Sequence, residues 1–69
     1  MNEILIELRK RKKLSQLAAA KAIGISQAML SYLERGGRHG SDKTKIKVAN
    51  YYKQPIEYIF FSGKNHKRW

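Results

Sequence analysis

The chain has 69 residues, contains no cysteine and carries a formal net charge of +10. This length suits one compact domain, and the lack of cysteine excludes disulfides and thiolate metal sites. The two histidines, His39 and His66, are too far apart in sequence to indicate zinc, so no metal or cofactor is expected. No apolar stretch suits a membrane span and the first residues do not resemble a signal peptide, so we expect a cytoplasmic protein.

The charge is the strongest bulk feature. Fifteen lysines and arginines stand against five acidic residues, and such a field attracts polyanions, with nucleic acid first among them. Charge alone does not identify a function, because many basic chains bind nothing in particular. The prediction therefore depends on how the helices arrange these residues.

The first half of the chain predicts two short helices. In 2–12, Ile4, Leu5 and Leu8 form an apolar stripe, acidic residues come early and basic residues late, as the helix dipole favours. Ser15 is then expected to cap a second helix over 16–23. The residues of this helix expected to face inward are Leu17, Ala20 and Ile23.

A third helix is predicted over 26–35. Ser26 is the expected N-cap, and Gly36 and Gly37 end the helix. Leu30 and Leu33 are expected to face inward.

Two more helices are predicted after a loop at 38–41. Ser41 is expected to cap a helix over 42–53, and Pro55 sets the first turn of a helix over 55–61. The basic segment 62–69 is expected to be a flexible tail, which leaves 1–61 as the folded domain. The inward residues expected here are Ile46, Ala49, Tyr52, Ile56, Ile59 and Phe60.

The second and third helices have the pattern of a helix-turn-helix. Ala20 is small where the two helices cross, and Gly24 can take the positive φ that a tight turn between them requires. If the apolar residues of 26–35 face inward, its opposite face is polar but uncharged, which suits the reading of base edges. That outward face carries Gln27, Ala28, Ser31 and Tyr32.

These residues give the chain a specific resemblance. It resembles the lambda-repressor-like, Cro-type family of helix-turn-helix regulators, also called the xenobiotic-response-element family, over about residues 4 to 60. The resemblance implies an all-α, five-helix bundle. The matching residues are Leu8-Arg9, Leu14-Ser15-Gln16, Ala20, Ile23-Gly24-Ile25-Ser26, Leu30, Leu33-Glu34-Arg35-Gly36 and Ile56-Glu57-Tyr58-Ile59-Phe60.

The resemblance implies a role for each position on the recognition helix. Gln27 matches a base-contacting position, and glutamine can bind adenine through two hydrogen bonds. Ala28 either touches a thymine methyl group or only fills the surface. Ser31 and Tyr32 are the next outward residues, although Tyr32 can instead pack at the core edge or in a dimer interface.

Other residues are expected to position the protein on the DNA backbone. Gln16 matches a phosphate-contacting position, and we also expect it to brace Gln27. Arg9 and Glu34 match positions that form an internal ion pair in the family. The residues expected at DNA phosphates are Gln16, Ser26, Arg35, Arg38 and Lys43.

The chain departs from the family pattern after the glycine turn. Gly40-Ser41 stands where members often have Pro-Ser, and Asp42 and Lys45 stand where they often have apolar residues. The loop and the start of the fourth helix are therefore the least typical part of the match.

The sequence favours one of three function classes. The favoured one is a transcriptional regulator, a repressor, that binds a palindromic double-stranded operator as a homodimer through Pro55, Ile56, Tyr58, Phe61 and the tail. The alternative is a small helical module that acts through a partner protein. An enzyme is not expected, because there is no paired nucleophile and base, no pair of carboxylates and no Gly-rich phosphate loop. Neither a membrane nor a small-molecule ligand is expected as a partner.

Overall fold

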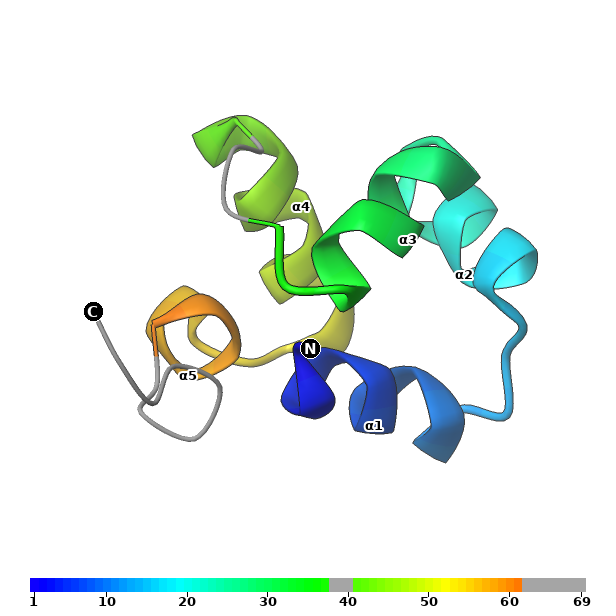
Figure 1. Ribbon diagram of the computed structural model, residues 1–69, viewed down its shortest axis with the longest axis horizontal. Helices are drawn as coiled ribbons and strands as arrows, with labels where there is room; N and C mark the ends of the chain where they lie inside the picture. The colour runs from blue at the N-terminus through cyan, green and yellow to red at the C-terminus, as the bar shows by residue number, and fades with distance from the viewer. Residues whose placement is uncertain (38–40, 62–69) are drawn as a thin grey trace.

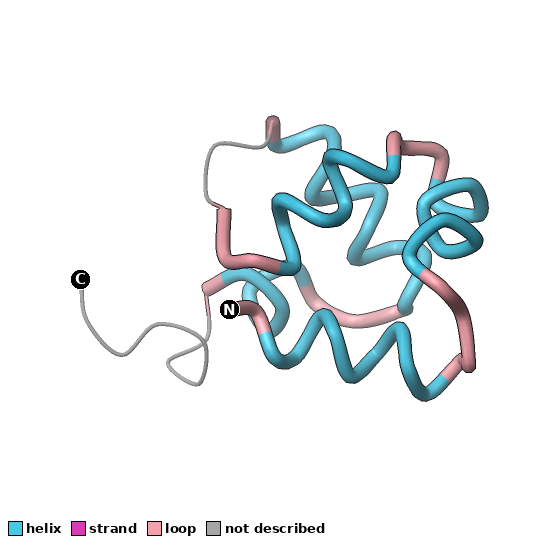
Figure 2. The backbone as a smooth tube through the Cα atoms, turned by 45° about the vertical axis from the view of Figure 1, so that its right-hand side comes forward, coloured by secondary structure: helices cyan, strands magenta, loops and turns pink. Residues whose placement is uncertain are grey.

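The computed structural model describes residues 1–37 and 41–61, which form a bundle of five helices and contain no strand (Figure 1 and Figure 2). The helices in chain order are α1 (Glu3–Arg11), α2 (Gln16–Ile23), α3 (Gln27–Glu34), α4 (Asp42–Tyr52) and α5 (Ile56–Phe60). Each lies within its predicted range, and the all-α fold class is confirmed. Arg38, His39 and the segment 62–69 lie outside the described residues. No helix in the described part of the chain combines the length and apolarity needed to cross a bilayer.

The predicted serine caps are confirmed at the starts of α2, α3 and α4. Each serine hydroxyl accepts a hydrogen bond from the backbone N–H three residues later, at 3.0 to 3.1 Å. Such a bond satisfies one of the N–H groups that the first turn of a helix leaves without a partner. The three caps are Ser15, Ser26 and Ser41.

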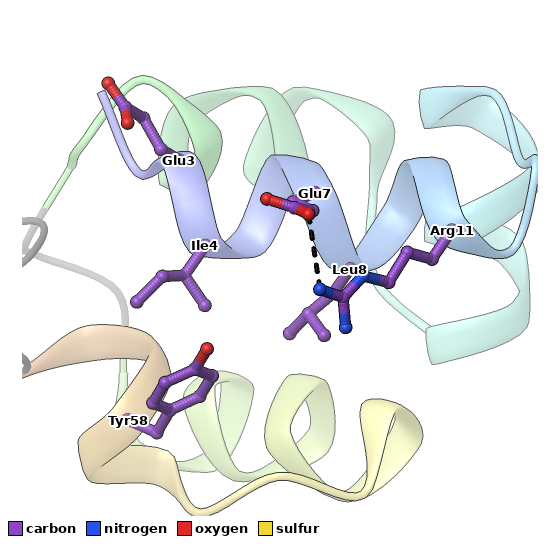
Figure 3. A pocket seen from close by; sticks show the side chains of 6 residues that line it. All are labelled: Glu3, Ile4, Glu7, Leu8, Arg11 and Tyr58. Carbon is purple, nitrogen blue, oxygen red and sulfur yellow. Dashed lines mark hydrogen bonds and ion pairs between the residues drawn. The ribbon is translucent and has the colours of Figure 1, made fainter.

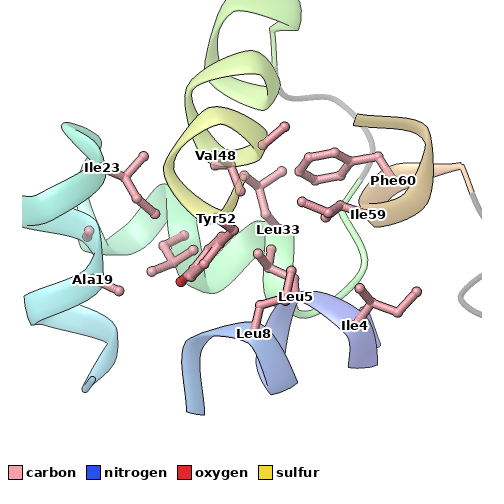
Figure 4. Close-up of a cluster of buried hydrophobic side chains, with 13 residues drawn as sticks. Ile4, Leu5, Leu8, Ala19, Ile23, Leu33, Val48, Tyr52, Ile59 and Phe60 are labelled. Carbon is pink, nitrogen blue, oxygen red and sulfur yellow. The ribbon is translucent and has the colours of Figure 1, made fainter. Parts of the chain in front are cut away.

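All five helices contribute apolar side chains to one core (Figure 4). Leu5, Leu30 and Leu33 are completely buried at its centre, and Ile56 is half-buried against its edge. The buried members are Ile4, Leu5, Leu8, Ala19, Ala20, Ile23, Leu30, Leu33, Val48, Ala49, Tyr52, Ile59 and Phe60.

Two residues that were predicted to face inward are exposed. Leu17 is 49% exposed and Ile46 is 50% exposed, whereas Ala19 and Val48 take the inward places. Both errors have the same cause, because a stripe at i, i+3 and i+6 spans about 120° of a helix and is too wide for these short contacts. In α4 the inward stripe instead begins at Lys45, one residue before the one expected.

Asn2 joins the start of the chain to two other helices. Its side-chain oxygen accepts from the N–H of Leu5 at 2.9 Å and so caps α1, while its side-chain nitrogen donates to the carbonyl of Ile59 at 3.0 Å. The backbone N–H of Asn2 also donates to the carbonyl of Glu34 at 2.9 Å. Since Asn2 is 5% exposed, the start of α1 and the ends of α3 and α5 are joined at one buried point.

Candidate nucleic-acid interface

The turn between α2 and α3 depends on the backbone of Gly24. This residue ends α2 with φ of 94°, and its N–H donates to the carbonyl of Ala20 at 2.9 Å. The N–H of Ile25 donates to the same carbonyl at 3.0 Å, which closes the end of the helix. A Cβ at position 24 would meet no atom within 4 Å, so glycine is required here by the dihedral angle and not by space.

A charged cluster fixes α2 relative to α3. The Arg9 guanidinium donates to both carboxylate oxygens of Glu34, at 2.7 and 3.2 Å, and to the carbonyl of Leu14 at 2.8 Å. The amide of Gln16 donates to Glu34 Oε1 at 3.0 Å. Because Glu34 ends α3 and Gln16 begins α2, this carboxylate ties the two helices and α1 together.

The prediction that Gln16 braces Gln27 was wrong. The Gln16 amide is directed to Glu34, whose buried carboxylate is a stronger acceptor than the neutral amide of Gln27. The brace exists, but it acts on the end of α3 rather than on its first residue. Gln27 is exposed at the start of that helix.

The packing of α3 leaves one face of this helix pointing away from the core. Leu30 and Leu33 are completely buried, while Gln27 and Ala28 are exposed and Ser31 is half-buried. At about 100° per residue, the outward residues fall within an arc of about 140°. This arc carries Gln27, Ala28, Ser31, Tyr32 and Arg35.

Tyr32 lies at the border of that arc. The ring packs so closely on the backbone of Gly37 that a Cβ there would lie 2.3 Å from two ring carbons. The N–H of Gly37 also donates to the carbonyl of Tyr32 at 2.9 Å, and the half-buried ring packs against the core. Of the roles left open for Tyr32, packing at the core edge is therefore the one seen in the structure.

Two of the residues expected at DNA phosphates are exposed basic side chains. Arg35 is exposed at the end of α3, and its Nη1 donates to the hydroxyl of Ser31 at 2.5 Å. Lys43 is exposed in the first turn of α4. Ser26 Oγ is also exposed while it caps α3. Arg38, the remaining expected phosphate contact, lies outside the described residues.

The helix pair and its outward arc agree with a match to a known family. A model of the helix-turn-helix family matches residues 5–59. The chain belongs to the lambda-repressor-like helix-turn-helix family. It is a regulator of the DNA-binding class, and double-stranded DNA is its class of partner. The comparisons with curated proteins and with solved structures found no match.

One buried cation distinguishes this helix-turn-helix domain from the usual pattern. Lys45 is 8% exposed, and its Nζ lies 5.7 Å from the ring centre of Phe60 and 5.5 Å from that of Phe61. The aliphatic stem fills the position where the family often has an apolar residue, and the ammonium group is held against the aromatic rings of the last helix. The spacing of Lys45, Val48, Ala49 and Tyr52 was the signal for this, and it was overlooked because lysine was counted as polar.

The buried hydroxyl of Tyr52 is a second polar group of the helix-turn-helix core that the sequence did not indicate. It has no hydrogen-bond partner among the described residues. Burial raises the pKa of Tyr52 from 10.0 to about 12, and the charges of Glu34 and Tyr51 add to this. The ring meets that of Tyr51 edge-on, with centroids 5.0 Å apart. Tyr52 therefore favours its neutral form strongly.

A hollow lies between α1 and α5 of this helix-turn-helix domain (Figure 3). It contains two of the five acidic residues of the chain, and an ion pair of 3.2 Å joins Glu7 to Arg11 at its edge. Acidic groups repel phosphate, so this side is unsuited to DNA. The hollow is lined by Glu3, Ile4, Glu7, Leu8, Arg11 and Tyr58.

Proposed function

We propose that this protein represses transcription by binding a palindromic operator as a homodimer, with α3 in the major groove. The observation that carries the proposal is the outward arc of α3, which is polar and uncharged except at its end and stands on a completely buried apolar face. A helix needs such a support to hold side chains against base edges. Occupation of a promoter by a small domain is sufficient for repression.

Two exposed side chains of the arc have expected partners at base edges. Gln27 is exposed at the start of α3 and suits a two-bond contact with adenine, and Ala28 beside it suits a thymine methyl group. Gln16, Ser26 and Lys43 lie at helix starts, where backbone N–H groups and the helix dipole favour phosphate. We assign these three to positioning on the backbone.

The test is to select bound DNA from a random pool and then titrate salt against the selected site and random DNA. We expect Gln27→Ala to lower the preference for the selected site by about 1–3 kcal/mol, with little change on random DNA. Lys43→Gln should weaken binding to both DNAs equally and reduce the slope of log affinity against log salt concentration by about one unit. Lys10→Gln on the outer face of α1 is the charge-matched control. Equal affinity of the wild-type protein for both DNAs would defeat the proposal.

The proposed dimer surface is on α5 and the residues beside it. Tyr58 is 44% exposed and Phe61 is 53% exposed, next to exposed Pro55 and half-buried Ile56. Two copies joined there must place their recognition helices about 34 Å apart, so that both enter the major groove one helical turn of DNA apart. We expect Tyr58→Glu to shift the protein towards monomer in sedimentation and to weaken binding to a palindrome more than to a half-site. A monomer that binds selected DNA only after a second protein is added would favour the partner-dependent alternative.

A further inference from the structure

The hydrogen bond between Arg35 and Ser31 decides which donors the recognition face presents. Arg35 Nη1 donates to Ser31 Oγ at 2.5 Å, and the two residues are one turn apart on the outward arc of α3. Among the described residues, the ion pairs join Arg9 to Glu34 and Arg11 to Glu7, so no carboxylate neutralises Arg35. Its guanidinium group is therefore held by a neutral hydroxyl and keeps its full charge towards the DNA side.

This bond makes the outward groups of Ser31 and Arg35 mainly donors. A serine hydroxyl has one hydrogen to donate, and since its oxygen already accepts from Arg35, that hydrogen is free to turn away from the helix. The guanidinium group has five N–H donors, of which the bond to Ser31 uses one. In the major groove, guanine offers two acceptors, N7 and O6, whereas adenine pairs an acceptor with a donor and cytosine offers a donor. A pair of residues that presents mainly donors matches guanine better than adenine or cytosine.

The same bond also moves the charge towards the part of the helix that reaches bases. Residues near the start of a recognition helix contact base edges, and Arg35 lies at the end of α3, where a phosphate contact is the usual expectation. By folding back onto Ser31, the guanidinium group lies about one helical turn, or about 5.4 Å, nearer to the start. That places it beside Ser31, which lies about 40° around the helix from Gln27 within the same outward arc.

We propose that Ser31 and Arg35 read one guanine as a unit, which makes Arg35 a specificity-determining residue of the operator contact. Ser31 holds the guanidinium group in place, and Arg35 forms the two hydrogen bonds to guanine N7 and O6. The inference rests on the proposed function and adds to it the identity of one base. It also replaces the assignment of Arg35 to the phosphates.

The experiment selects bound DNA with the wild-type full chain and with Arg35→Lys, Arg35→Gln and Ser31→Ala, with Lys43→Gln as the control. We expect the wild-type sites to share a guanine that Arg35→Lys and Ser31→Ala both cease to require, with at least about a 5-fold loss of discrimination at that position only. Arg35→Lys keeps its charge, so its salt slope should not change, although a lysine cannot reproduce the planar two-bond contact. Lys43→Gln should leave every base preference intact.

Two outcomes overturn the inference, and they differ from failure of the proposed function. If Arg35→Lys and Arg35→Gln bind all sequences more weakly but keep the wild-type preferences, Arg35 is a backbone contact. If the Ser31 and Arg35 variants relax different positions, the two residues do not act as a unit. If the wild-type protein selects no common sequence, the proposed function fails, and the inference fails with it. Arg35 is exposed, so its variants are expected to fold, and circular dichroism checks this.

Discussion

Removal of Arg9 from the buried charge cluster should cost the protein about half of its stability or more. The Glu34 side chain is 3% exposed and the Arg9 side chain 14%, so water screens this pair little. Arg9→Met removes the two guanidinium bonds to Glu34 and the one to the Leu14 carbonyl, and it leaves the carboxylate with only the Gln16 amide. Breaking a buried pair in this way costs about 3–5 kcal/mol. At about 0.05–0.15 kcal/mol per residue, a chain of 69 residues has only about 3–10 kcal/mol of stability.

The double variant separates the loss of the pair from the penalty of an unpaired charge. In Arg9→Met with Glu34→Leu no carboxylate is left buried, and we expect stability close to that of the wild type or above it. Urea unfolding of all four proteins, followed by circular dichroism, gives the coupling energy of the cycle. A loss below about 1 kcal/mol in Arg9→Met, or a double variant as unstable as the single ones, would refute this reasoning.

Three further changes test single features of the fold. Gly24→Ala should lower the free energy of unfolding in urea by about 1–2 kcal/mol, through the positive φ alone. Gly24→Asn should cost less, because asparagine tolerates the left-handed region. Equal losses of stability in the two variants would contradict the dihedral argument. Ser26→Ala should cost about 1 kcal/mol by loss of the α3 cap, and an unchanged midpoint would show that the cap contributes nothing. Tyr52→Phe should be neutral or stabilising near pH 7, because it removes a buried hydroxyl without a partner. The raised pKa of Tyr52 gives the wild type stability that is complete below pH 10 and is lost towards pH 12, so the variant should lose less over that range; identical pH profiles would contradict this.

The helix-turn-helix could be predicted from the sequence because its local signals agree with one another. Ser15, Gly24 and Ser26 each have a local backbone reason to occur where they do, and the structure shows two caps and a left-handed turn at those positions. The helix ends followed from such residues with little need for information about the rest of the chain. This agreement explains why the helix pair was predicted correctly.

The inward faces of the short helices were harder to predict. Lys45 fills an inward place with its stem and meets two aromatic rings, which depends on where α5 packs. The Gln16 amide likewise had two acceptors within its expected reach, and burial of Glu34 decided between them. Contacts between helices distant in sequence determine these details, and periodicity within one helix does not contain that information.

The bond from Asn2 to Ile59 has a consequence for the order in which the protein matures. The chain is synthesised from the N-terminus, so the partner that holds the second residue is among the last of the described residues to be made. A nascent chain that has reached only the end of α4 possesses the complete helix-turn-helix, but the amide of Asn2 still has no carbonyl from α5 to bind. The ribosome must therefore pass residue 59 before this bond can form, so until then the first helix is held only by its contacts with α3, such as the pair of Arg9 and Glu34.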